Sequence, residues 1–154
     1  MTSDDSRKAL LKLQALCARK EYCTSEMRGK ALKLTEGDTD AAEELVAALV
    51  SDRFVDDLRY ASAFARDKAH LDGWGPVKIR YQLGAKGISP SVIAEALSEI
   101  EEEKAESRLS EILASKYRTL KDDPDVRLKL LKFALTRGYE YPAADRTVRE
   151  LTGK

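Results

Sequence analysis

The stretch that decides the fold is residues 75–88, Gly-Pro-Val-Lys-Ile-Arg-Tyr-Gln-Leu-Gly-Ala-Lys-Gly-Ile. Pro76 suits the first turn of a helix, where a backbone N–H has no partner within the helix and its absence costs nothing. Ile79 and Leu83 then follow at helical spacing. Gly87 suits the left-handed position that ends many helices. The stretch therefore predicts one short helix with an apolar side.

The same pattern returns at a fixed distance along the chain. Gly87 and Gly138 are 51 positions apart. Apolar positions around the two glycines align, with Ile79, Leu83, Ile93 and Leu97 opposite Leu130, Ala134, Ala144 and Val148. The first fifty residues fit if one turn is longer, which adds Met27, Ala31, Leu45 and Leu49 to the alignment. A period near fifty with three helical stretches in each period predicts one helical triplet per repeat.

The predicted fold is therefore all-α, with about nine helices in three tandem three-helix repeats. We place the repeats at residues 1–54, 55–102 and 103–154. A single triplet buries little apolar surface alone, so neighbouring repeats are expected to stack in series as an elongated array. Leu83 and Leu97 are predicted to be buried.

Polar residues mark the expected helix ends. Thr24 is predicted to cap the second helix, because its hydroxyl can accept from the first-turn amides. Asp40 with Glu43 has the spacing of a capping box. The adjacent carboxylates Asp56 and Asp57 point in different directions on a helix, so they indicate a helix N-terminus rather than a catalytic pair.

Charge is segregated although it cancels overall. The chain has 27 basic and 27 acidic residues, and charged residues make up 35% of it. Residues 36–57 carry a net charge of −7, whereas residues 58–90 carry +4. In the predicted array, the first two helices of each triplet are basic and the third helix of the first two triplets is acidic. This pattern indicates charged binding faces, and the alternative is solvated helix surface without a partner.

The composition argues against several classes of protein. No stretch approaches the ~18 apolar residues of a membrane span, and the polar start has no signal-peptide pattern, so we expect a cytoplasmic protein without a membrane partner. The thiols Cys17 and Cys23 are expected to be free, with Cys17 in the core. With His70 as the single histidine, a metal site is not expected. We predict no catalytic residues and no cofactor, and hence no enzyme.

The second repeat resembles a known family. Residues 54–68 read Phe-Val-Asp-Asp-Leu-Arg-Tyr-Ala-Ser-Ala-Phe-Ala-Arg-Asp-Lys and precede the stretch at 75–88. Together they resemble the signature of the RecX family: an acidic pair before Arg-(Phe/Tyr)-Ala, then a basic helix leading to Leu-x-x-Lys-Gly-Ile. Lys78 stands where the family more often has Arg, and Gln82 where it often has Glu.

The resemblance implies regulation of the recombinase RecA. RecX proteins bind the filament of RecA on single-stranded DNA and limit its recombinase, ATPase and co-protease activities. The expected partners are this filament and single-stranded DNA itself, and the protein is expected to be a monomer. The hypothetical partner- or DNA-binding residues are the basic residues of the second repeat and its tryptophan: Arg59, Arg66, Lys68, Trp74, Lys78, Arg80 and Lys86.

Two alternatives stay open at this point. The triplets could form a direct DNA-binding array of helix-turn-helix-like modules, although zero net charge argues against strong non-specific DNA binding. The chain could also be a structural scaffold, in which case the basic residues have no explanation. Trp74 has two interpretations as well, either as a staple that fixes its turn to the core or as an exposed anchor.

Overall fold

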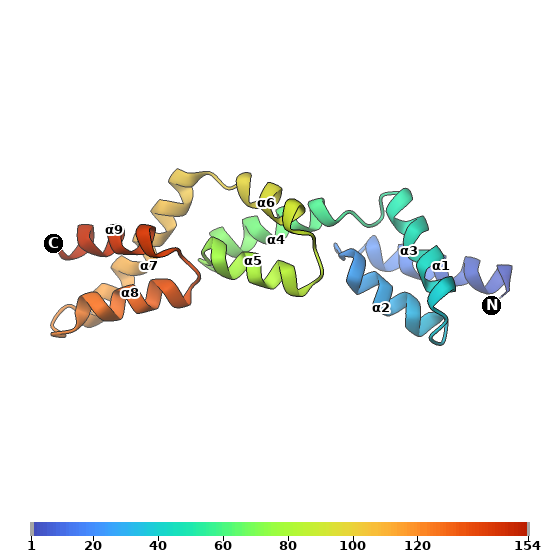
Figure 1. The fold of residues 1–154 in the computed structure, drawn as a ribbon, viewed down its shortest axis with the longest axis horizontal. Coiled ribbons are helices and arrows are strands. Elements are labelled where there is room, and N and C mark those ends of the chain that lie inside the picture. The colour runs from blue at the N-terminus through green and yellow to red at the C-terminus, as the bar shows by residue number, and fades with distance from the viewer. Residues whose placement is uncertain (1, 154) are drawn as a thin grey trace. The chain divides into compact units, whose positions relative to one another are not determined.

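The computed structural model describes residues 2–153, and within them the chain forms nine α-helices and no strand, as predicted (Figure 1). The outermost positions of the first and third predicted repeats, 1 and 154, lie outside the described residues. The helices are α1 (Ser3–Cys17), α2 (Thr24–Leu34), α3 (Thr39–Ser51), α4 (Asp57–His70), α5 (Pro76–Ala85), α6 (Pro90–Ser98), α7 (Glu102–Leu120), α8 (Val126–Thr136) and α9 (Tyr141–Thr152). They form three tandem three-helix repeats.

The chain divides into two compact units. The first holds the residues up to Ala61 together with Gly84–Ile93. The second holds Ser62–Leu83 together with the residues from Ala94 onward. The middle repeat therefore contributes to both units. The repeat boundaries at 54/55 and 102/103 and the elongated shape stay predictions.

The core of the first unit lies among the first three helices. Helices α1, α2 and α3 all contact one another. Met27 and Ala31 of α2 and Leu49 of α3 are completely buried, and Cys17 packs against this core while only partly buried. The fully buried thiol is Cys23 instead, and both cysteines are free.

The core of the second unit has the same construction. Helices α7, α8 and α9 contact one another. Leu113, Leu130 and Ala134 are completely buried, and Val148 is nearly so. The second helix of each triplet, α2 or α8, thus buries two residues four positions apart, and these residues are equivalent in the repeat alignment.

The buried positions confirm the predicted alignment of the repeats. The pairs on the second helix of each triplet, Met27–Ala31, Ile79–Leu83 and Leu130–Ala134, are all at most 1% exposed. On the third helix of the middle triplet the prediction holds for Ile93 but is wrong for Leu97, which is only partly buried. The neighbouring Ala96 is buried instead.

Residues with left-handed backbone conformation follow α5 and α8 at the two glycines that the sequence predicted as helix ends. Gly87 and Gly138 follow α5 and α8 with φ of 76° and 95°. Behind α2 the corresponding position is Glu36, with φ of 53°, and the amide of Gly37 closes the turn onto the carbonyl of Leu32 at 2.8 Å. The first triplet therefore forms the same helix end without glycine at the left-handed cap position.

Two predicted N-caps are wrong by one or two residues. The cap of α2 is Cys23, whose N–H donates to Glu26 at 2.9 Å, so Thr24 is the first helical residue. The cap of α3 is Asp38, which accepts from the amide of Ala41 at 3.1 Å. Both helices begin earlier than predicted. In α3 the upstream residue Asp38 accepts from a first-turn amide, whereas in α2 the Glu26 side chain accepts from the amide of the cap residue itself.

Two glycines let α5 and α8 meet end to end in the second unit. The amides of Gly75 and Val77 donate to the carbonyls of Arg137 and Gly138 at 2.8 and 2.9 Å. The free amides at the start of one helix thereby satisfy carbonyls at the end of the other. A Cβ on Gly75 would overlap the backbone of Gly138, and a Cβ on Gly138 would overlap Lys78. We call this contact the glycine joint.

We predict that Gly75→Ala destabilises the protein by about 1–3 kcal/mol, since the added methyl group forces two backbones apart. Gly84→Ala is the matched control, because Gly84 lies inside α5 and nothing comes within 4 Å of an added Cβ. The control is expected to gain about 0.5–1 kcal/mol from helix propensity. Urea unfolding followed by circular dichroism measures both, and equal midpoints for the two variants would contradict the prediction.

Candidate functional site

The structure brings together three of the predicted site residues, two lysines and the aromatic ring of Trp74. The ammonium groups of Lys68 and Lys78 lie 4.8 and 4.4 Å from the centroid of Trp74. Phe64 meets the same ring edge to face, with centroids 6.1 Å apart. Lys68 also pairs with Asp72 at 2.9 Å. We call Phe64, Lys68, Trp74 and Lys78 the Trp74 cluster; it joins the end of α4 to the start of α5.

Backbone constraints hold Trp74 in place. Its N–H donates to the carbonyl of Lys68 at 2.9 Å. Gly73, with φ of 68°, lies where a Cβ would overlap Ile112 of α7. Gly75 on the other side belongs to the glycine joint. The indole ring is half-buried, so Trp74 both fixes this turn and leaves part of its ring accessible beside two positive charges.

Two further predicted residues lie exposed on the same helices. Arg66 on α4 forms no ion pair within the described part of the chain. Among the described residues, Arg80 on α5 has one carboxylate at the limit of an ion pair, Glu140 at 4.0 Å, and the Arg80 side chain is 52% exposed. Helix α5 has no acidic residue. Both charged residues of this helix, Lys78 and Arg80, are therefore basic.

Sequence reasoning missed one exposed aromatic on that helix. Tyr81 is 74% exposed, and Val77, one turn earlier, is 45% exposed. The signal was present, because Ile79 and Leu83 identify the buried side of α5 and residues 77 and 81 fall away from it. An exposed tyrosine beside Arg80 enlarges the candidate surface.

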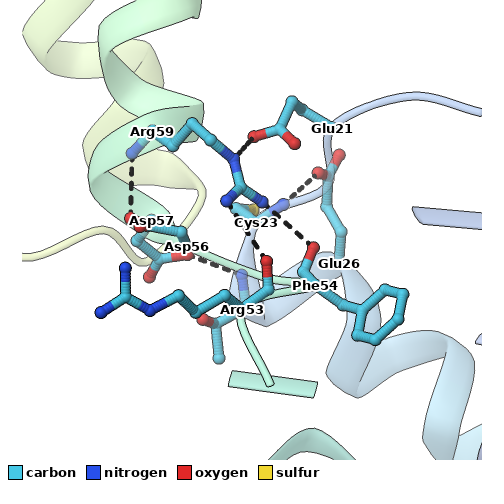
Figure 2. Close-up of polar contacts among 9 residues, drawn as sticks. Glu21, Cys23, Glu26, Arg53, Phe54, Asp56, Asp57 and Arg59 are labelled. Atoms are coloured by element: carbon cyan, nitrogen blue, oxygen red, sulfur yellow. Dashed lines mark hydrogen bonds and ion pairs between the residues drawn. The ribbon is translucent and has the colours of Figure 1, made fainter. Parts of the chain in front are cut away.

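Arg59, by contrast, is engaged within the first unit (Figure 2). Its guanidinium donates to Glu21 at 2.7 Å and to the carbonyls of Arg53 and Phe54 at 3.2 and 3.3 Å. The hydrogen bond to Glu21 is the main cause that raises the pKa of Arg59. This guanidinium therefore satisfies two backbone carbonyls in the segment just after α3.

The acidic pair does what the sequence predicted for it. Asp56 caps α4 by accepting from the amide of Arg59 at 3.0 Å. Asp57 accepts from the amide of Thr24 at 2.7 Å, so the first residue of α4 also satisfies an amide in the first turn of α2. One carboxylate thereby ties together segments 33 positions apart.

Lys86 is engaged near the same place. Its ammonium lies 3.4 Å from Glu26 and 5.7 Å from the ring centroid of Tyr60, and its carbonyl accepts from Ser25. The contacts Thr24–Asp57, Glu21–Arg59 and Glu26–Lys86 all lie in the first unit, and we call them the polar joint. The seven predicted site residues thus fall into two groups, five in the second unit and two in the polar joint.

No group of three or more His, Cys, Asp or Glu side chains within residues 2–153 could hold a metal ion. Among the same residues no helix is both long and apolar enough to cross a membrane. The fold and the site together define an all-α repeat protein with a basic, aromatic surface that is a candidate for binding.

Comparison with known proteins identifies the family. The family described as "RecX, second three-helix domain" matches residues 56–97. The regulatory protein RecX of Prosthecochloris aestuarii is 32% identical over 152 residues, which cover 98% of each chain. The protein therefore belongs to the RecX family.

Other relatives agree but differ in length. The chain is 33% identical to the regulatory protein RecX of Clostridium botulinum (strain Eklund 17B), with 77% of this chain and 57% of the relative aligned. For that of Lactococcus lactis (strain SK11) the identity is 31%, with 76% and 45% aligned. The chain thus spans about half the length of these two relatives. The crystal structure of RecX from Lactobacillus salivarius has the same fold, with a TM-score of 0.87 at 20% identity over 99% of this chain and 100% of that one.

We predict that Asp57→Ala destabilises the protein by about 1–2 kcal/mol, because the partly buried amide of Thr24 loses its acceptor. Asp57→Asn is the matched control, since its side-chain oxygen can still accept this hydrogen bond. Urea unfolding of both variants is the measurement. A loss as large in the asparagine variant would show that the negative charge, and not the hydrogen bond, matters.

The polar joint also predicts an effect of acid. Burial raises the pKa of Glu26, but the Cys23 amide and Lys86 outweigh it, so the pKa lies below its ordinary value. Ionised Glu26 therefore stabilises the fold above its unfolded pKa, and this stability is lost as the pH falls through the folded pKa.

We expect the stability advantage of the wild type over Glu26→Gln to shrink between about pH 5 and pH 3. Urea midpoints at a series of pH values measure it. Glu44→Gln is the control, because Glu44 is exposed and forms no ion pair among the described residues. A wild type that keeps its full advantage over Glu26→Gln at pH 3 would contradict the assignment.

Proposed function

We propose that this protein binds the filament that RecA forms on single-stranded DNA and limits the recombinase, ATPase and co-protease activities of RecA. Membership of the RecX family carries this proposal, because the relatives are named as regulatory proteins. We further propose that the protein acts as a cytoplasmic monomer without turnover of its own. Three repeats at residues 1–54, 55–102 and 103–154 would each offer a contact segment.

The proposed contact surface consists of the Trp74 cluster with Arg66 and Arg80. A partner with negative charge is favoured here, since α5 has no acidic residue and Arg66 and Lys78 have no carboxylate within the described residues. Lys68, by contrast, forms an ion pair with Asp72. Arg59 and Lys86 are left out of this surface because the polar joint engages them. Their proposed role is to hold α2 against α4 and α5.

Charge reversal of Lys78 and Arg80 to Glu tests the proposal. Each exposed contact is worth only about 0–1 kcal/mol, but a reversed pair in the middle of an interface costs several times that amount. The measurement is steady-state ATP hydrolysis by RecA on single-stranded DNA with increasing amounts of this protein. We expect the wild type to suppress hydrolysis well below one molecule per RecA subunit, and the double variant to need at least about tenfold more.

Lys121→Glu with Lys132→Glu is the matched control. Both lysines are exposed and lie in the second unit. Reversing two cations changes the net charge by the same amount in the control and in the test variant. The control is expected to inhibit like the wild type, and all variants should keep the same helical spectrum. If the wild type leaves hydrolysis unchanged at equimolar ratio, the proposed function fails. If Lys78→Glu with Arg80→Glu inhibits as well as the wild type, only the contact surface is wrong.

A direct DNA-binding array remains the second candidate, and the basic, tyrosine-bearing side of α5 favours it. Salt distinguishes the two modes. Binding to phosphates weakens steeply as salt rises, because each contact releases counterions. If the protein binds DNA without RecA, with a steep salt dependence, and leaves ATP hydrolysis unchanged, the DNA-binding array is the better description.

A further inference from the structure

We propose that Lys20, Tyr22 and Lys30 form a second binding site, in the first unit, for single-stranded nucleic acid. The ammonium groups of Lys20 and Lys30 lie 4.8 and 5.3 Å from the ring centroid of Tyr22. This arrangement matches that of Lys68 and Lys78 around Trp74. We call the three residues the Tyr22 site. The inference deepens the proposed function and rests on it for the choice of polymer.

The two aromatic rings occupy equivalent places in the repeats. Tyr22 lies two residues before α2, and Trp74 lies two residues before α5. They are 52 positions apart, as are the buried residues Met27 and Ile79 that follow them. Both rings are half-buried, and Tyr22 packs against the core of the first unit. Each ring is therefore partly covered by its own unit and has two lysine ammonium groups beside it.

The lysines do not come from equivalent places. In the alignment, Lys20 corresponds to Asp72 and Lys30 to Gln82, while Lys78 corresponds to Glu26. Simple repetition of a sequence would have copied the lysines together with the ring. Two different pairs of positions build the same arrangement instead, which favours a shared role for the arrangement itself.

The Tyr22 site also lacks compensating negative charge. The neighbouring carboxylate Glu21 forms an ion pair with Arg59 at 2.7 Å. The carboxylate of Glu26 accepts from the amide of Cys23 and forms an ion pair with Lys86. Within residues 2–153, neither Lys20 nor Lys30 forms an ion pair. Two ammonium groups beside one ring without a carboxylate make a place where an anion gains favourable interactions.

The chemistry favours a single nucleic-acid strand over an acidic protein. Phosphates repeat along a strand, and ammonium groups bind them as point charges without demanding one geometry. Aromatic rings add stacking with any base, worth about 1–3 kcal/mol per base. All four cations around the two rings are lysines, whereas arginine would be the better choice for bidentate carboxylates. A strand that reaches both sites would gain avidity without new contacts.

The test is fluorescence anisotropy with a labelled oligothymidylate of about 30 nucleotides, several times the smaller site sizes known for single-strand binders. It uses the whole chain in the absence of RecA. Lys20→Gln with Lys30→Gln removes the charges and keeps the side-chain length. We expect the dissociation constant to rise about fivefold or more, and the slope of log affinity against log salt to fall by about 1.4, since each single-strand phosphate contact contributes ~0.7.

Lys12→Gln with Lys33→Gln is the matched control, because both lysines are exposed on the same triplet. It removes the same charge and should leave the salt slope unchanged. For the ring, Tyr22→Phe keeps the aromatic face and should bind like the wild type. Tyr22→Leu should weaken binding about fivefold or more. The lysine pair decides the matter even if Tyr22→Leu does not fold.

Three outcomes would overturn the inference. The wild type could fail to bind the oligonucleotide at low salt. The control pair could weaken binding as much as the site pair, which would mean that only net charge matters. The site pair could instead reduce inhibition of RecA without changing oligonucleotide binding, which would identify an acidic protein surface as the ligand. Each leaves the wild-type ATP hydrolysis assay as a separate test of the proposed function.

Discussion

The direct meeting of two helix ends at the glycine joint is the constraint on which the second unit depends. Helix ends leave amides and carbonyls without partners, and most proteins satisfy them with side chains or water. Here the start of α5 and the end of α8 satisfy each other, at 2.8 and 2.9 Å. Such an approach requires that neither backbone carries a Cβ at the contact. The turn with Trp74 is held between this joint and α7, so the candidate surface inherits its geometry from two glycines.

The first unit solves the same problem with side chains. There the end of α5 meets the start of α2, and the bonds run through Ser25, Glu26, Lys86 and Asp57. Carboxylates and ammonium groups respond to salt and acid, whereas backbone amides do not titrate. The polar joint and the glycine joint therefore give the two units different sensitivities, although the repeats that build them are equivalent. The family signature in this region is largely a structural one, because Asp56, Asp57 and Arg59 cap and connect helices.

Much of the fold could be predicted because its signals are local. Proline at helix starts, glycine at helix ends and apolar residues at fixed spacing depend on neighbours a few positions away. The prediction that Leu97 is buried was wrong because periodicity identifies one side of a helix. It does not identify which of two adjacent residues the neighbouring helices cover. The prediction of Thr24 as N-cap was wrong because Cys23, a less usual cap residue, takes that position and its amide donates to Glu26. The candidate site was harder, since Arg59 and Lys86 look like free cations until residues 21 and 26 are brought beside them by folding.

The place of Trp74 has a practical consequence for spectroscopy. It is the one tryptophan of the sequence, and it lies half-buried between two ammonium groups and a phenylalanine ring. Indole emission responds to nearby charge and to solvent, so its wavelength and intensity report on a single known location in the second unit. The protein thus carries an intrinsic optical probe at its own candidate binding surface. Association and dissociation there can be followed in real time without a dye.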